Sequence, residues 1–185
     1  MSHSSPLIAG LDLSLTSTGV MVISGGLQVV VERLVTSRGS RSDSWERRVE
    51  RVDRLASTIV SSALEAGDVD LVVVEAPSYG RASDPGFYDR AMLTHAVLSA
   101  LGRRGTPWGM VPPSSLKAIM TGRGDATKAL VTAAVSRILP EALLERSDTA
   151  DAGGLALVGA AHLSLWEVGP ARLKALEGCD MPAKR

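Results

Sequence analysis

The chain is poor in cysteine and in long apolar runs, and both absences limit what it can be. It has one cysteine, Cys179, so no disulfide bond can form within the chain, which fits a reducing compartment. No apolar stretch is long enough to span a bilayer, and the first residues lack the basic segment and apolar segment of a signal peptide. We therefore expect a cytoplasmic protein without a membrane partner.

Aromatic content and net charge are also low. Aromatic residues make up 3% of the chain and the formal net charge is zero, so the bulk charge gives no argument for a polyanionic partner. Basic residues nevertheless gather between residues 79 and 128, where seven Lys and Arg stand against three Asp, a local balance of +4. With 185 residues, 45% of them apolar, the chain can form one globular domain with a substantial core.

Four acidic residues stand where a fold has little use for them. Asp12 interrupts the apolar run 6–13, and Glu75 ends the apolar strand that begins at Leu71. Asp148 and Asp151 lie three residues apart, one helical turn, before a small apolar stretch. Taken singly, Glu75 could be an ordinary strand-end charge, and the Asp pair could favour a helix amino end. Two carboxylates about 4 Å apart repel by roughly 4 kcal/mol, so a cluster of four needs cations to persist. Together the four acids therefore predict ligands for divalent cations.

The apolar patterns predict an α/β protein with a five-stranded mixed sheet flanked by helices. Strands are expected over residues 6–13, 18–24 and 27–35 as an antiparallel meander, and over 71–75 and 108–111 as two parallel strands. Helices are expected over 44–67, 87–104, 114–120, 126–139 and 152–165. This order predicts one domain over residues 1–168 and a loosely ordered tail over 169–185.

The same order of elements is that of the ribonuclease H fold, and several motifs resemble one family within it. The motif GLDLSLTSTG (10–19), the strand that ends at Glu75 and the pair Asp148-x-x-Asp151 resemble the RuvC family of Holliday junction resolvases. The segment 111–128 adds two lysines, Lys117 and Lys128, eleven residues apart around a Gly-x-Gly turn. One departure is Leu13-Ser14, where the family commonly has Pro-Gly after the first aspartate.

The resemblance implies a structure-selective endodeoxyribonuclease that resolves Holliday junctions by metal-dependent phosphodiester hydrolysis, with other branched DNA as a further class of substrate. Asp12, Glu75, Asp148 and Asp151 would hold two Mg²⁺ ions, for which Mn²⁺ can substitute. Lys117 and Lys128 would act with them on the phosphate. Both lysines, with three further residues, would also bind DNA: Tyr79 as a base-stacking aromatic, Arg81 and Arg123.

The resemblance also implies a homodimer, since two symmetric active sites suit the two strands of a four-way junction. We expect the interface on the helix 87–104, with intramolecular packing as the alternative for the same apolar residues: Met92, Leu93, Ala96, Val97, Ala100 and Leu101.

Three other functions remain open at this point. The glycine-flanked motif around Asp12 also resembles the first phosphate loop of actin-like nucleotide-binding ATPases, although those proteins join two such domains. A catalytically silent nucleic-acid-binding module is the second. A third keeps the chemistry but changes the substrate, to structured RNA as in YqgF-like proteins or to flaps and forks.

Overall fold

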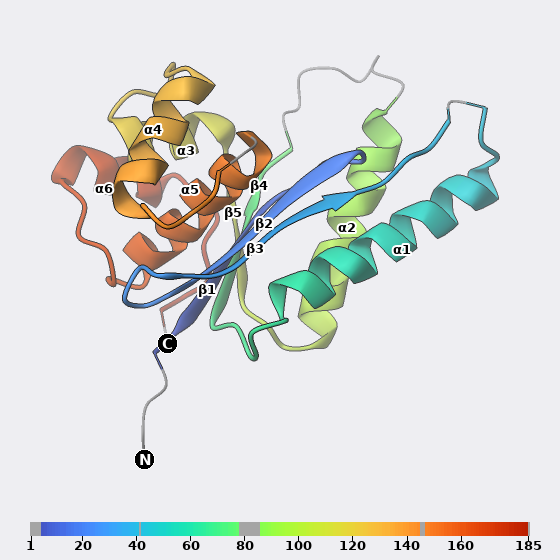
Figure 1. Cartoon of the computed structure of the whole chain (residues 1–185), viewed down its shortest axis with the longest axis horizontal. Coiled ribbons are helices and arrows are strands. Elements are labelled where there is room, and N and C mark those ends of the chain that lie inside the picture. The colour runs from blue at the N-terminus through green and yellow to red at the C-terminus, as the bar shows by residue number, and fades with distance from the viewer. Residues whose placement is uncertain (1–4, 41, 78–85, 145–146, 185) are drawn as a thin grey trace.

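A five-stranded mixed sheet forms the centre of the computed structural model, which describes residues 5–40, 42–77, 86–144 and 147–184 (Figure 1). The strands are β1 (Leu7–Asp12), β2 (Ser17–Ser24), β3 (Val29–Thr36), β4 (Leu71–Glu75) and β5 (Trp108–Val111), in the order β3-β2-β1-β4-β5. The meander of β1, β2 and β3 is antiparallel, whereas β4 and β5 are parallel to β1. The predicted sheet is therefore confirmed.

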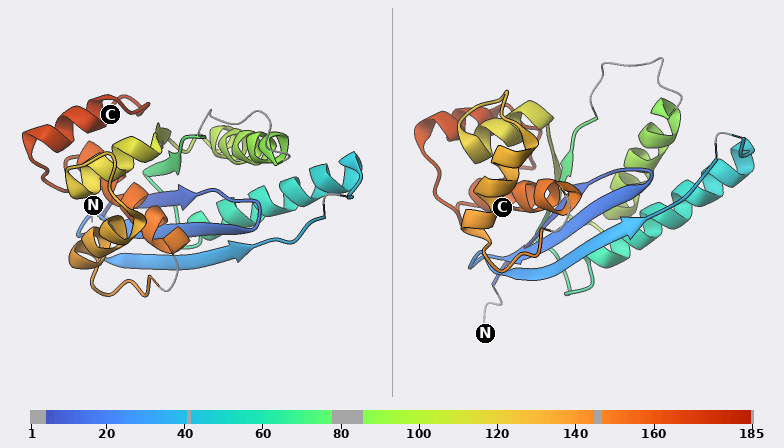
Figure 2. Two further views of the ribbon diagram at one scale, coloured as in Figure 1. Left: turned by 90° about the horizontal axis from the view of Figure 1, so that it is seen from above. Right: turned by 45° about the horizontal axis from the view of Figure 1, so that its top comes forward.

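Helices cover both faces of this sheet (Figures 1 and 2). One face carries α1 (Trp45–Ala63) and α2 (Phe87–Arg103), and the other carries α3 (Pro113–Thr121), α4 (Lys128–Ile138), α5 (Ser147–His162) and α6 (Pro170–Glu177). Two separate apolar clusters fill the two interfaces. No helix in the described ranges is long and apolar enough to cross a membrane.

Strand alternation decides which residues meet α5. Ala9, Leu11 and Val74 lie in the cluster under α1 and α2, whereas Ile8 and Val73 lie in the cluster under α5. Because successive side chains of a strand point to opposite faces, Gly10, Asp12 and Glu75 lie on the α5 face. Both acids are thus directed toward the helix that carries the other two.

Helix α5 packs unusually close to β1 and β2. Residues 149–161 of α5 are all buried, and most of them are Gly or Ala. A methyl group added at Gly10 would overlap the carbonyl oxygen of Ala152, and one added at Gly19 would overlap that of Asp148. These two glycines therefore permit the close approach that brings the start of α5 to the ends of β1 and β2.

The residues assigned to a dimer interface on α2 require a correction. Leu93, Val97, Ala100 and Leu101 are buried in the monomer, in the cluster that also contains the apolar residues of α1. Helix α1 covers this side of α2, and the bidentate ion pair between Arg48 and Asp89 holds the two helices together. Of the six, Met92 and Ala96 are partly exposed, and they too pack against this cluster. Intramolecular packing, the alternative interpretation, accounts for the four buried residues.

The expectation of a loosely ordered tail also does not hold. Helix α6 begins at Pro170, and Leu176, Cys179 and Met181 pack against the cluster under α5. Met110 of β5 and Asp180 exchange two backbone hydrogen bonds, of 2.7 and 3.0 Å. The carboxyl-terminal segment is therefore part of the folded domain.

Candidate active site

Asp12 and Glu75 end neighbouring parallel strands. Because Leu11 pairs with Val74, the next residue of each strand, Asp12 and Glu75, come side by side at the carboxyl edge of the sheet. In open α/β sheets this edge is where ligands bind. The two acids, 63 positions apart in sequence, therefore meet as the strand pattern predicts.

Asp148 and Asp151 approach from the first turn of α5. Asp148 lies beside Gly19, which pairs with Asp12 across β1 and β2, and Asp151 is buried. The Oγ of Ser17 donates a 2.6 Å hydrogen bond to Oδ2 of Asp148. The start of α5 thus brings both aspartates to the end of β1.

The electrostatics place all four acids in one environment. Burial, followed by the charge of Asp151, raises the pKa of Asp12 to about 6, although Lys128 opposes the shift. Burial also raises the pKa of Glu75 to about 7, with further contributions from Asp12 and Asp151. Asp148 adds to the shift of Asp12. Asp12 is therefore near enough to Glu75, Asp148 and Asp151 for its charge to interact with each of theirs.

Both predicted lysines lie beside this acidic cluster. Lys128 is the first residue of α4, and its Nζ donates a 3.0 Å hydrogen bond to Oδ2 of Asp151, which raises the pKa of the lysine. Lys117 on α3 lies close enough to Glu75 to oppose the rise of its pKa. The cluster is therefore bordered by two positive charges that a phosphate could contact.

The donor set fits a hard divalent cation. All four groups offer carboxylate oxygens, the ligands that Mg²⁺ and Mn²⁺ prefer, and their mutual repulsion is a cost that a cation would remove. Among the described residues, no three acidic, histidine or cysteine side chains are placed close enough together to hold a metal ion as they stand. Asp151 is instead paired with the ammonium group of Lys128.

The other predicted DNA-binding residues show no contact with this site among the described residues. Arg123 lies in the exposed turn between α3 and α4, where its guanidinium makes two 3.1 Å hydrogen bonds to Asp125. Tyr79 and Arg81 fall outside the described residues.

Hydroxyl groups that were not among the predicted site residues hold the connection between β1 and β2. Thr18 is fully buried; its Oγ1 donates to the carbonyl of Ser14 at 2.8 Å and accepts from the backbone N–H of Ser14 at 3.0 Å. The run of Ser and Thr over residues 14–18 was the available signal, because such side chains often bond to nearby backbone groups.

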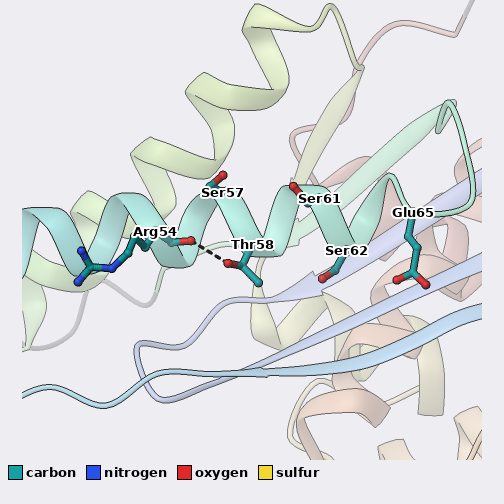
Figure 3. A pocket seen from close by; sticks show the side chains of 6 residues that line it. All are labelled: Arg54, Ser57, Thr58, Ser61, Ser62 and Glu65. Atoms are coloured by element: carbon teal, nitrogen blue, oxygen red, sulfur yellow. Dashed lines mark hydrogen bonds between the residues drawn. The ribbon is translucent and has the colours of Figure 1, made fainter.

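Two concavities of the surface differ in their position relative to the acidic cluster. One of about 210 Å³ adjoins Glu75, between the end of β4 and the start of α2, where Leu13 and Phe87 also line it. Another, of about 510 Å³, runs along the exposed side of α1 and is lined by Ser57, Ser61 and their neighbours (Figure 3). The second contains none of the predicted site residues and lies apart from the acidic cluster.

Curated proteins resemble this chain over most of its length. A crossover junction endodeoxyribonuclease RuvC from Parafrankia sp. is 33% identical over 181 residues, 95% of each chain. The protein of the same name from Frankia alni is 33% identical over 171 residues, 91% of this chain and 82% of its own. No family model matches the chain.

Solved structures of proteins that act on Holliday junctions share the fold of this chain. Thermus thermophilus RuvC in complex with a Holliday junction substrate superposes with a TM-score of 0.69 at 24% identity, over 96% of this chain and 99% of that one. The yeast mitochondrial Holliday junction resolvase Ydc2 superposes with a TM-score of 0.58 at 15% identity, over 94% and 81%. The ribonuclease H-like fold is thus confirmed, and from its curated relatives the chain belongs to the RuvC family of crossover junction endodeoxyribonucleases.

Proposed function

We propose that this chain is a structure-selective endodeoxyribonuclease that resolves Holliday junctions by metal-dependent phosphodiester hydrolysis. The proposal is supported chiefly by the charge interactions that link Asp12 with Glu75, Asp148 and Asp151, and by the hydrogen bond of Lys128 to Asp151. The names of the curated relatives and the solved complex of a similar protein with a Holliday junction support the substrate. Because the relatives are bacterial, we place the reaction in the cytoplasm, where bacterial DNA lies.

The four carboxylates would hold two Mg²⁺ ions, with Mn²⁺ as a substitute. Bound there, the ions would acidify the attacking water and stabilise charge on the phosphate and its leaving oxygen. Asp12 and Glu75, on the ends of two paired strands, supply ligands on a rigid edge. Asp148 and Asp151 supply ligands from a helix whose position the sheet fixes.

The two lysines would complete the site for DNA. Lys128 can exchange its bond to Asp151 for one to a DNA phosphate, because its side chain is 64% exposed. Lys117 lies on the Glu75 side of the cluster and would hold the backbone of the cleaved strand. We also assign phosphate contacts to Arg81 and Arg123, and base stacking to Tyr79.

We further propose that the chain acts as a homodimer, because two equivalent sites match the two-fold symmetry of a four-way junction. Symmetric incisions in opposed strands would support this, whereas single incisions at random positions would contradict it.

The direct test is incubation with a synthetic four-way junction, a linear duplex, a flap and a structured RNA, each with Mg²⁺, Mn²⁺ or a chelator. We expect cleavage of the junction only when a metal ion is added. Asp148→Asn should lower the cleavage rate by about 100-fold or more while junction binding is retained. Normal cleavage by this variant, or cleavage of RNA in preference to the junction, would reject the proposal.

A further inference from the structure

We propose that Ser17 is a positioning residue for Asp148, and that its hydroxyl group sets the orientation of this carboxylate for metal binding. The inference rests on the proposed function, which makes Asp148 a metal ligand. Ser17 itself touches neither the metal nor the DNA in this proposal; it acts through Asp148.

The bond between the two side chains is short and links distant parts of the chain. Oγ of Ser17 donates to Oδ2 of Asp148 at 2.6 Å, across 131 positions of sequence. This length is typical of a hydroxyl group that donates to an ionised carboxylate, which is stronger than a bond between neutral groups. One oxygen of Asp148 is therefore engaged, and rotation of the carboxylate about its bond to Cβ is restricted.

The backbone around Ser17 is fixed on both sides. Ser17 begins β2 and pairs with Thr36 of β3, so its Cα is held by the sheet. On the preceding side, Nη2 of Arg51 on α1 donates to the carbonyl of Leu15 at 3.0 Å, and the buried Thr18 hydroxyl closes the connection onto Ser14. The hydroxyl of Ser17 is thus presented by a rigid element.

The backbone of Asp148 is fixed as well, but by a different contact. Its carbonyl oxygen lies where a side chain at Gly19 would be, so the first turn of α5 is pressed onto β2. With both backbones held, the remaining freedom of Asp148 is the rotation of its side chain. The Ser17 hydroxyl restricts that rotation through the shorter of the two hydrogen bonds to the carboxylate, since Ser147 bonds to Oδ1 at 3.4 Å. The freedom lost in this way would otherwise be lost on binding the metal.

Hydrogen bonds of this kind to ligating carboxylates typically contribute 10–100-fold to metal affinity or activity. If the bond served only to hold β2 and α5 together, its loss would lower folding stability but leave the metal affinity of the folded protein unchanged. Metal affinity therefore distinguishes a positioning role from a purely structural one.

The experiment compares Ser17→Thr with Ser17→Val, two side chains of nearly the same shape of which only Thr has a hydroxyl group. Mn²⁺ affinity is measured by calorimetry without DNA, and junction cleavage is measured over a range of Mg²⁺ concentrations. We expect Ser17→Val to weaken Mn²⁺ binding by about 10–100-fold and to require correspondingly more Mg²⁺ for half-maximal cleavage. Ser17→Thr should restore both values, and junction binding in Ca²⁺ should be alike in the two variants.

Ser61→Ala is the matched control, because Ser61 is an exposed residue of α1 in the groove away from the site (Figure 3). Ser17→Ala replaces the Val variant if the Val variant does not fold. Equal Mn²⁺ affinity in the Thr variant and the variant without the hydroxyl would overturn the inference, whatever their stabilities. Metal binding by the unaltered chain without cleavage of any junction would overturn the proposed function alone, and the loss of Mn²⁺ affinity without the hydroxyl would still support the role of Ser17.

Discussion

At the scale of single residues, the acidic side chains of the candidate site repel one another. Asp12 and Glu75 sit side by side, and burial together with neighbouring carboxylates raises their pKa values to about 6 and about 7. A site arranged for cations should show this property when the cations are absent, because its ligands are brought together before the compensating charge arrives.

This repulsion predicts how the stability of the metal-free protein depends on pH. Both acids bind protons more tightly when folded, since their ordinary pKa values of 3.8 and 4.5 rise to about 6 and 7. Folding therefore takes up protons within that window, and the free energy of unfolding should fall as pH rises from about 4 to about 7. Urea denaturation in chelator between pH 4 and 8 measures the effect.

Glu75→Gln provides the comparison, because its neutral amide cannot titrate. The variant should lose less stability over the same pH range, and at pH 8 it should gain less from added Mg²⁺ than the unaltered chain does. Parallel curves for the two proteins would contradict the electrostatic interpretation.

Lys128 is the second residue whose role can be separated from stability. It begins α4, where a positive charge opposes the helix dipole, so Lys128→Gln should not destabilise the fold by more than about 1 kcal/mol. Cleavage should fall by about 100-fold, and the slope of log affinity for the junction against log salt should shrink by about one. Lys174→Gln on α6 is the control, and an equal effect of both substitutions would remove Lys128 from the site.

At the scale of elements, strand alternation explains why much of the site could be predicted. An acid inside or at the end of an apolar strand is visible in sequence, and the parallel order of β1 and β4 then places Asp12 beside Glu75. The pair on α5 follows from its three-residue spacing. Ser17 could not be found in this way, because its bond to Asp148 depends on how closely α5 approaches β2.

The α2 assignment was wrong for four residues because periodicity does not say which neighbour covers an apolar face. Leu93 and Val97 could equally have met a partner chain or α1, and in the structure they pack with the α1 cluster. Helix α6 was not predicted. Its start at Gly169-Pro170 is nevertheless recognisable in the sequence, because Pro is favoured in the first turn of a helix.

Close packing of α5 on the sheet leads to a prediction about glycine. Gly10→Ala adds a methyl group that overlaps backbone atoms of Ala152 and Ala156, which cannot move as a flexible side chain can. We expect a loss of about 1–3 kcal/mol in the free energy of unfolding, measured by urea denaturation.

Gly102→Ala is the matched substitution for this test. Gly102 lies in the last turn of α2 with open space around its Cα, so alanine should stabilise the protein by about 0.5–1 kcal/mol. Similar losses at both positions would show that the close approach of α5 is not what requires Gly10.

At the scale of the whole molecule, the carboxyl-terminal segment closes the domain at the edge strand β5. The exchange of two backbone hydrogen bonds between Met110 and Asp180 protects part of an edge that could otherwise pair with another chain. The side chain of Met181 also occupies the space beside Gly109. The active-site acids lie in β1, β4 and α5, none of which includes this segment.

A chain that ends at Val168 should therefore lose stability but keep its site. Removal of Leu176 and Met181 from the apolar cluster should cost at least about 2 kcal/mol, which lowers the melting temperature by about 4–8 °C. A chain that ends at Pro182 keeps α6 and the contacts of Met110, and should melt as the full chain does. Because the acids are held by the sheet and α5, Mn²⁺ affinity below the melting transition should be the same in all three proteins. Loss of metal binding in the shorter chain alone would show that α6 supports the site as well as the fold.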